Sequence, residues 1–454
     1  MEQPTNHFGT NPGISRRSFS LGLGGWLTSQ LSYIPGLAML DRDAVEDQIV
    51  AARALLETDS ASGGSELDDR AELMTDAKVA WSYFENWNVF RRPIIPGTAY
   101  LEDGKRRGYP LLTMWDVASL INACVSARLL GLISDAELLA KGRQIVKVLR
   151  RSTARFGNVL LPSIEVSATS MQARPAGFDA ADVGRLLISL KLLDNLTIKK
   201  LAIDQLIGHW GFSRVIQGGT VRSIAGNRLQ PFDSNSYVRY YVQGYRLWGY
   251  DIPDPFVGAL PQLTSGSGPE FFVAAAGIGR FATEPLVTEL IELGDNSETR
   301  FLADMLYAAQ IERFQSIGIP TCVSEGILDQ TPWFSYQACQ FNPPGAHQWV
   351  IDTGREEHSA IVKSKGDSLR TISTKGSFLW RAARPGAYSK MLVDLARRKA
   401  RDSKLAFLSN IYETSQEPTN CSDINANGLI LESIAYILGG RRPLLEISAG
   451  GTTG

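Results

Sequence analysis

The stretch MWDVASLINACVSARLLGLI, residues 114–133, carries the pattern that decides the fold. Its apolar residues recur at positions i, i+3, i+4 and i+7, which is the spacing of a helix with one buried face. The same stretch places a carboxylate, Asp116, directly after the indole ring of Trp115. Because buried carboxylates need hydrogen-bonding or charged partners, we expect this helix to combine core packing with polar chemistry at its first turn.

Helical spacing recurs along the chain, and strand-like segments are short and lie between the helices. Thr75 or Asp76 is predicted to cap the helix that contains the cluster WSYFENW. A short hairpin is expected over residues 212–226, with Gly218 and Gly219 at its turn. The other predicted helices cover residues 41–57, 135–151 after the cap Ser134, 179–196, 197–210, 234–250, 284–294, 298–315, 357–365, 385–400 and 427–438.

The helices come in successive pairs, joined by loops that alternate between short and long. About ten to twelve helices in pairs can bury their inner faces as a double ring, in which inner helices surround an axis and outer helices pack against them. This all-α fold, an (α/α)6 toroid, collects long loops and short hairpins at one face, where aromatic and acidic side chains would line one cleft. The alternative is a helical solenoid, but no short fixed-period repeat is visible.

The composition is that of a globular protein without a strong overall charge. The 454 residues are 44% hydrophobic and 9% aromatic, which is enough for a substantial core. Forty-six Lys and Arg residues oppose 47 Asp and Glu residues, so the formal net charge is −1. No polybasic run in the sequence suggests a membrane surface, and nucleic-acid binding is not expected.

The N-terminal segment predicts an export signal. Residues 15–25, SRRSFSLGLGG, place paired arginines before a short apolar run, and small residues follow at Gly36 and Ala38. This arrangement resembles the twin-arginine signal, which carries folded proteins across a bacterial inner membrane. We therefore expect the twin-arginine translocase to act on this chain, and a periplasmic or extracellular location. The expected domains are a signal peptide over 1–38, a helix and linker over 39–75, the toroid over 76–440 and a tail over 441–454.

Histidine and cysteine give no pattern typical of a metal site or a charge-relay triad. The four histidines are scattered, and the four cysteines lack metal-ligand spacing. Cys124 lies in the apolar helix of residues 114–133 and is expected in the core. Export would permit a disulfide, which the sequence cannot pair. We therefore expect neither a metal ion nor a cofactor.

Six blocks of sequence occur in a recognisable order. They are AWSYFEN (80–86), YPLLTMWDVAS (109–119), RPAGFDAADVGRLLISLKLL (174–193), YRLWGYD (245–251), SEGILDQTPWFSY (324–336), and YET (412–414) with NANGLILESIAY (425–436). Together they resemble the bacterial domain of unknown function DUF3131 over nearly the whole mature chain. That family is similar to (α/α)6-toroid carbohydrate-active enzymes, including endo-acting β-1,2-glucanases and the glucoamylase-like domains of cyclic glucan synthases. The resemblance implies a sugar-binding cleft.

Glycoside cleavage needs two carboxyl groups beside one bond, about 5–5.5 Å apart for retention and about 6.5–9.5 Å apart for inversion. The resemblance assigns Asp116 and Glu325 to acidic positions of the family, and Glu270 to a third in which the surrounding order is changed. Relatives carry a further acid where this chain has Ala176, and Asp179 is the nearest carboxylate. We expect the general acid and base among these four carboxylates, although Asp116 could instead cap a helix and Glu325 could be a solvated loop residue.

Sugar rings stack on Trp and Tyr, and Asp, Glu and Asn bind sugar hydroxyls. Trp81 has an alternative role in the core, and Asn427 could simply begin the last inner helix. Glu432 is either functional or salt-bridged, and Asp182 is expected to accept hydrogen bonds with Arg185 as its partner. The predicted substrate-binding residues are Trp81, Glu85, Trp115, Asp329, Trp333, Tyr336, Glu413 and Asn427.

These features predict an exported monomeric glycoside hydrolase or transglycosylase that cleaves or remodels a bacterial glucan or exopolysaccharide. Its partner would be a poly- or oligosaccharide. A non-catalytic glycan-binding or polysaccharide-assembly factor is the first alternative, because Ala176 replaces an acid. A toroidal polysaccharide lyase is the second alternative, with Tyr109, Tyr237 or Arg239 as its base.

Overall fold

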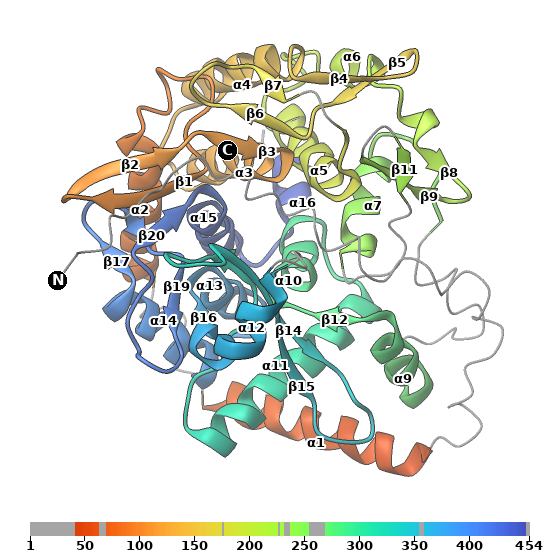
Figure 1. The fold of residues 1–454 in the computed structure, drawn as a ribbon, viewed down its shortest axis with the longest axis vertical. Coiled ribbons are helices and arrows are strands. Elements are labelled where there is room, and N and C mark those ends of the chain that lie inside the picture. The colour runs from red at the N-terminus through yellow and green to blue at the C-terminus, as the bar shows by residue number, and fades with distance from the viewer. Residues whose placement is uncertain are drawn as a thin grey trace.

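A closed ring of helices forms the centre of the protein. The computed structural model describes residues 41–62, 70–174, 177–225, 228–230, 237–253, 268–353 and 358–450. Within them, six helices pack each against the next, and the last packs back on the first (Figure 1). In ring order these are α3 (Met114–Leu129), α5 (Ala180–Leu196), α7 (Val238–Arg246), α10 (Thr283–Glu292), α13 (Thr374–Ala383) and α15 (Ile424–Leu438). The predicted inner ring is confirmed.

Hydrogen bonds across the axis show that α3, α10 and α15 run in the same direction. Trp115 and Asn425, from the first turns of α3 and α15, both donate to Glu284 in the first turn of α10. Two turns further along, Asn122 of α3 donates to Glu292 of α10 and to Glu432 of α15. Side chains at matching heights therefore meet at two levels, and the first turns of these three helices lie at the same end of the ring.

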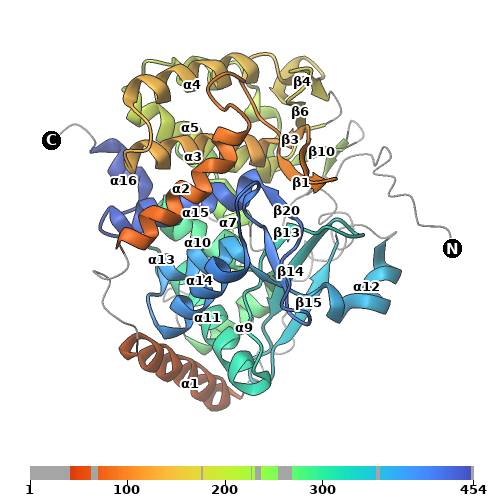
Figure 2. The same cartoon turned by 90° about the vertical axis from the view of Figure 1, so that its left-hand side faces the viewer.

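An outer layer covers the ring. The outer helices are α2 (Arg70–Asn86) against α15, α4 (Asp135–Leu149) against α3, α11 (Ser297–Ile317) against α10, and α14 (Ala387–Lys399) against α13. Farther out, α1 (Arg42–Ala61) packs on α11, α14 and α9 (Pro269–Ile278) (Figure 2). The segment expected as a tail contains α16 (Leu444–Ala449), which packs against α5, α10 and α15. Because Ser448 bonds Asn195 near the end of α5, α16 covers the end of the ring opposite the first turns.

Short strands lead into the first turns of the inner helices. β3 (Leu111–Thr113), β16 (Thr371–Ser373) and β20 (Cys421–Asp423) run directly into α3, α13 and α15, and β12 (Arg280–Phe281) ends just before α10. β13 (Glu325–Ile327) pairs with β14 (Phe334–Gln340), which also pairs with β12 and β15 (Gln348–Asp352). β20 pairs with β1 (Thr98–Glu102), itself joined to β2 (Lys105–Tyr109). These strands surround one mouth of the ring.

Several local predictions can be checked directly. The hairpin forms with β8 (Ile216–Gln217) and β9 (Thr220–Val221) around Gly218 and Gly219, both of which adopt positive φ. The predicted cap at Thr75 or Asp76 is wrong, because α2 begins at Arg70 and the buried Asp76 accepts hydrogen bonds from Arg397 and Arg401. The sequence pattern also predicts no helix where α9 and α13 lie.

The remaining expectations concern cysteines, export and membranes. All four cysteines are buried free thiols, and Cys124 lies in the main core as predicted. Among the described helices, none is long and apolar enough to span a membrane. The predicted signal peptide and Ala176 lie outside the described residues.

Candidate active site at the mouth of the ring

The carboxyl group of Glu325 lies at the mouth, next to the aromatic residues Tyr237 and Tyr336. Glu325 begins β13, opposite Tyr336 of β14, and is only 2% exposed. The hydroxyl of Tyr237, just before α7, donates to Oε2 of Glu325 over 2.7 Å. Trp115, a predicted substrate-binding residue, is only 2% exposed, and its ring packs edge-on against that of Tyr237, with centroids 5.7 Å apart. Burial, together with the charges of Glu325 and Glu284, raises the pKa of Tyr237 well above its ordinary value, so Tyr237 acts as a neutral hydrogen-bond donor.

Glu284 joins the mouth to the interior. Its Oε1 accepts from Trp115 Nε1 at 3.0 Å, from Arg185 Nη1 at 3.1 Å and from Asn425 Nδ2 at 2.9 Å. Its Oε2 forms a buried ion pair with Lys375 of α13. A fully buried carboxylate is stable only when such partners compensate its lost hydration. Glu284 therefore ties four other inner helices together and fixes the orientation of Trp115.

Arg185 continues this polar axis below the mouth. Its guanidinium is fully buried and pairs with Glu284, Glu292 and Glu432, at 3.1, 3.7 and 3.2 Å. It also lies over the ring of Trp115, 4.7 Å from the centroid. The ion pairs of Arg185 are with these three glutamates and not with Asp182, its predicted partner. Glu432 is salt-bridged, which is one of the two roles predicted for it. Burial, followed by the neighbouring charge of Glu292, raises the pKa of Glu432 well above its ordinary value.

Asp116 occupies the first turn of α3 at the same mouth. Its Oδ2 accepts from the backbone N–H of Thr113 at 3.0 Å, and the side chain of Thr113 accepts from the backbone N–H of Asp116. This reciprocal capping box confirms the alternative of a helix cap for Asp116. The residue remains partly exposed and directly follows Trp115.

The two other predicted catalytic carboxylates have partners elsewhere. Asp179 is the N-cap of α5, and its Oδ1 accepts from the backbone N–H groups of Ala181 and Asp182. Glu270 lies in the first turn of α9 and pairs with Arg42 of the outlying helix α1 at 3.4 Å. The observed partners of Glu270 and Asp179 thus belong to α1 and to the first turn of α5.

The hairpin after Glu325 carries three of the predicted binding residues. Asp329 accepts from the Tyr412 hydroxyl at 2.6 Å and from the backbone N–H of Asn420 at 2.7 Å. Trp333 is half-buried and adopts a positive φ of 68°. Tyr336 is 8% exposed and packs with Phe334 in a small apolar cluster. Tyr336 lies directly opposite Glu325 on the paired strand, whereas Asp329 and Trp333 lie in the connection between β13 and β14.

The remaining predicted binding residues have structural contacts. Trp81 is buried and stacks on Phe84, with centroids 5.2 Å apart, while Glu85 is exposed on α2. Glu413 accepts two hydrogen bonds from Arg313, at 2.9 and 2.7 Å. The buried amide of Asn427 bonds the main chain of Phe407 and Asp423 and the hydroxyl of Ser422. The structure does not bring these four residues to Glu325.

Sequence reasoning missed Glu284, Lys375 and Asn425, and it weighed Tyr237 only as the base of a lyase. One signal was available: polar residues recur two turns apart within otherwise apolar helices, as in Asn425 with Glu432. That spacing keeps both side chains on one helix face, which here is the face toward the axis.

Comparison with known proteins agrees with this fold. An endo-β-1,2-glucanase from Chitinophaga pinensis, in complex with sophorotriose and glucose, superposes with a TM-score of 0.58 at 12% identity, covering 84% of this chain and 97% of that one. The Talaromyces funiculosus endo-β-1,2-glucanase with sophorose gives 0.55 at 11% identity, covering 85% and 88%. A glucoamylase-like protein from Bacteroides fragilis gives 0.56 at 14% identity, covering 86% and 95%.

At these identities the likeness shows a shared fold, that of glucoamylase-like and glucanase toroids. No curated protein matches the chain in sequence. Residues 75–440 match the family model described as "Protein of unknown function (DUF3131)". The match spans most of the chain and includes every inner helix. The chain therefore belongs to the DUF3131 family.

Proposed function

We propose that this protein is a glycoside hydrolase or transglycosylase that acts on a glucan or related exopolysaccharide through carboxyl groups at the mouth of the ring. The observation that carries the proposal is the placement of Glu325 at that mouth, bonded to Tyr237, whose ring packs against that of Trp115. A carboxyl group beside aromatic rings is a setting for a proton donor, whereas the Trp115 ring itself is buried and offers no open face for sugar stacking. The shared fold with two endo-β-1,2-glucanases supports the same substrate class.

In the proposed reaction, Glu325 is the general acid. Its proton passes to the glycosidic oxygen as the bond from that oxygen to the anomeric carbon breaks, and the leaving sugar departs as an alcohol. Asp116 is the base that takes a proton from the water attacking the anomeric carbon. Its position in the first turn of α3 suits an ionised carboxylate, because the helix N-terminus carries a partial positive charge. Tyr237 positions Glu325.

The proposal includes export of the protein to the periplasm or beyond. The paired Arg16 and Arg17, the apolar run after them and the small residues near Ala38 support it. Replacing both arginines by lysine should keep the protein in the cytoplasm of a bacterial host that has a twin-arginine translocase. Equal export of the variant and the native chain would contradict this part of the proposal.

A glycan-binding protein without turnover is the second candidate. It is favoured by the burial of Glu325 and by the engagement of Asp179 and Glu270 at other sites. If Asp116 serves only as a helix cap, the mouth lacks a second catalytic carboxylate and could hold a sugar without cleaving it.

One set of assays separates these candidates. Incubating the protein with a panel of β-glucans, including β-1,2-glucan, and with bacterial exopolysaccharides should release reducing ends. Glu325→Gln and Asp116→Asn should each reduce release at least about a hundredfold, while Glu46→Gln on the exposed face of α1 should not. Both site variants should still be stabilised thermally by the substrate.

The other outcomes are equally clear. Thermal stabilisation by a glycan without release of reducing ends would identify a binding protein. Absorbance from a new carbon–carbon double bond would identify a lyase. Full turnover by Glu325→Gln would show that Glu325 is not the acid.

A further inference from the structure

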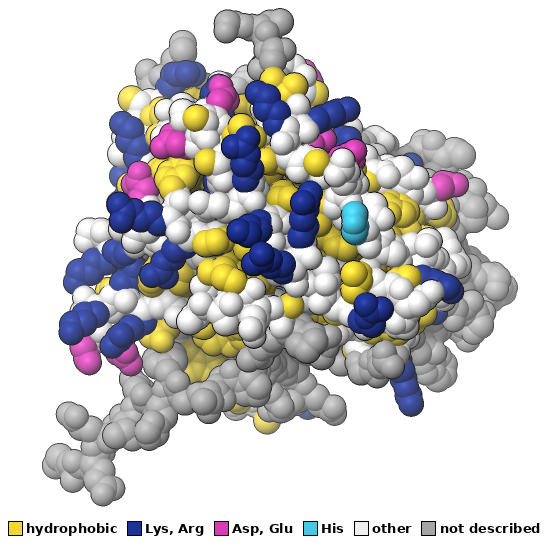
Figure 3. Space-filling model, turned by 90° about the horizontal axis from the view of Figure 1, so that it is seen from above, with side chains coloured by type: hydrophobic (Ala, Val, Ile, Leu, Met, Phe, Trp, Pro, Cys, Tyr) yellow, Lys and Arg dark blue, Asp and Glu magenta, His cyan; other side chains and the backbone are white. Residues whose placement is uncertain are grey.

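A strongly basic surface lies on the outside of the ring, over the second half of α4 and the turn between α5 and α6 (Ile203–Gly208). Figure 3 shows Lys and Arg side chains gathered on this side of the molecule. Exposed side chains from two separate segments form it, and we call it the basic face: Arg143, Lys147, Arg150, Lys199 and Lys200. Because the whole chain has a net charge of −1, this face is a local separation of charge.

The charges of the basic face are only partly neutralised. Within the ranges that the structure describes, no ion pair engages Arg143, Lys147 or Arg150. Asp194 interacts with Lys199 and lies near the exposed Asp204, and Asp135 interacts with Lys200 but is itself held by Arg128. A net positive field therefore remains for an anionic partner.

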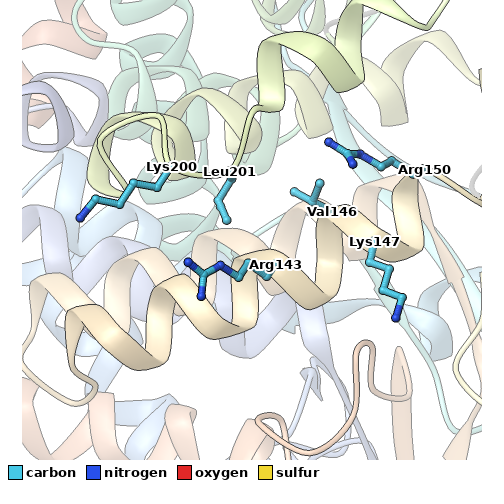
Figure 4. A pocket seen from close by; sticks show the side chains of 6 residues that line it. All are labelled: Arg143, Val146, Lys147, Arg150, Lys200 and Leu201. Atoms are coloured by element: carbon cyan, nitrogen blue, oxygen red, sulfur yellow. The ribbon is translucent and has the colours of Figure 1, made fainter.

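Four of these cations border a hollow of about 300 Å³ (Figure 4). Val146 and Leu201 also line it, and they are only 5% and 6% exposed, so they form a recessed apolar floor. Arginine binds phosphate oxygens through two parallel hydrogen bonds, and lysine adds a point charge. The hollow can thus receive a phosphate group and part of the uncharged body attached to it.

An exposed apolar residue stands beside these cations. Ile198 is 61% exposed, although it is a large apolar side chain. It is the second residue after the end of α5 and has a φ of +51°, a conformation that favours Gly or Asn and strains a β-branched residue. The left-handed backbone ends α5, since the N–H groups of Ile198 and Lys199 then bond the carbonyls of Asn195 and Asp194. An exposed isoleucine side chain contributes nothing to that turn, which points to a role in contact with a partner.

A second exposed apolar side chain lies along the same edge. Leu160 in β5 (Val159–Pro162) is 36% exposed and pairs across the hairpin with Arg155 of β4 (Thr153–Phe156). Figures 1 and 2 place this hairpin and α4 along the same edge of the molecule. Apolar side chains interspersed with cations are the pattern of a protein that lies on a membrane surface.

We propose that the basic face and Ile198 form a docking surface for a membrane that carries anionic phospholipids. The lipid phosphates would bind Arg143, Arg150 and the lysines, while Ile198 would enter the interfacial region of the bilayer. A soluble polyanion would use the same cations but would gain nothing from an exposed isoleucine. The proposed attachment is peripheral, because surface side chains make all of its lipid contacts. It is independent of any glycosidase activity at the mouth.

Vesicle co-sedimentation tests the proposal. The protein should bind vesicles of phosphatidylcholine mixed with phosphatidylglycerol at low salt and should not bind pure phosphatidylcholine. Each cation near an anionic surface contributes a roughly fivefold increase in partitioning, so Lys147→Gln/Lys200→Gln should weaken binding at least about tenfold. The matched control is Lys363→Gln/Lys365→Gln, which removes two exposed lysines from α12 (Ser359–Lys365) and should bind like the native chain.

The variant Ile198→Asn tests the contribution of the exposed isoleucine to vesicle binding. Asparagine tolerates positive φ, so this variant should unfold at the same temperature or higher, yet lose several-fold in vesicle binding. Ile317→Asn, which replaces a 46% exposed isoleucine at the end of α11, should leave binding unchanged. Equal binding to both vesicle types, or equal loss in the two lysine pairs, would overturn the proposal. So would binding of dextran sulfate at least as tight as that of lipid, with Ile198→Asn unaffected.

Discussion

The hydroxyl of Tyr237 lies 2.7 Å from Oε2 of Glu325 and joins the beginning of α7 to β13. A hydrogen bond to a carboxylate contributes about 1.5–3 kcal/mol, and its loss leaves a buried oxygen without that donor. Tyr237→Phe should therefore reduce turnover of a glycan substrate roughly tenfold or more, mainly through kcat, because the substrate-binding side chains remain.

A matched control lies one turn along the same helix. Tyr240 donates to Oε2 of Glu292 at 2.6 Å, below the mouth. Tyr240→Phe should lower the free energy of unfolding while leaving kcat and KM close to native values. If Tyr237→Phe and Tyr240→Phe altered turnover equally, the bond between Tyr237 and Glu325 would have no special role in the reaction.

The buried guanidinium of Arg185 should be indispensable for stability. It compensates three glutamates that are fully buried. Removing one partner of a buried ion pair leaves uncompensated charge and typically destabilises by about 3–5 kcal/mol. Arg185→Met should produce a loss of this size in urea unfolding, whereas Arg214→Met at an exposed site should stay within about 0.5 kcal/mol of the native chain. A loss below about 1 kcal/mol for Arg185→Met would mean that these carboxyl groups are largely protonated.

Glu432 should make stability depend on pH. Its pKa in the folded protein is raised by burial and by Glu292, so the folded state holds a proton that the unfolded state releases near the ordinary value of 4.5. Stability from this group is complete below that value and is lost as pH rises toward the folded pKa, by up to about 1.4 kcal/mol per pH unit.

Glu432→Gln cannot release the proton, so the comparison isolates the effect. The unfolding free energy of the native chain minus that of this variant should fall as the pH increases above 4.5. Glu446→Gln, at an exposed carboxylate of α16, should show no such trend. A difference that rises with pH would show that the folded protein lowers the pKa of Glu432.

The ring could be predicted from sequence because its helices have regular apolar faces. Two predictions that failed, for α13 and for Asp76, have a common cause. α13 contains Lys375 and Arg381 at buried positions, which interrupt its apolar pattern. Lys375 is tolerated there because Glu284 comes from another helix. Asp76 looks like a cap in sequence for the same reason, since its arginine partners lie more than 300 residues away.

The candidate site was predictable only where one short segment contains the relevant groups. Glu325 could be singled out because aromatic residues follow it closely, and Asp116 because it adjoins Trp115. The partners of Glu284 come from four other helices, and no local pattern encodes their meeting. Glu270 and Asp179 were assigned by motif, but their contacts depend on α1 and on helix capping.

The crossing of α5 and α7 should tolerate no added methyl group. Gly184 faces the main chain of Tyr241, and Gly244 faces the carbonyl oxygen of Gly184, so a Cβ at either position would overlap backbone atoms. Backbone cannot move aside without separating the two ring helices, and overpacking of this kind costs about 1–3 kcal/mol or more. Gly184→Ala and Gly244→Ala should each lower the unfolding midpoint in urea.

Gly277→Ala in α9 is the control, since nothing lies within 4 Å of the added carbon. Alanine restricts the unfolded chain and favours helix, so this variant should be as stable as the native chain or gain up to about 1 kcal/mol. The two glycines share one contact, so the double variant Gly184→Ala/Gly244→Ala should lose less unfolding free energy than the sum of the two single losses. The first methyl group already separates the helices, and the second therefore costs less. Fully additive losses would mean that each methyl group is accommodated separately, and that close approach at this crossing does not hold the ring together.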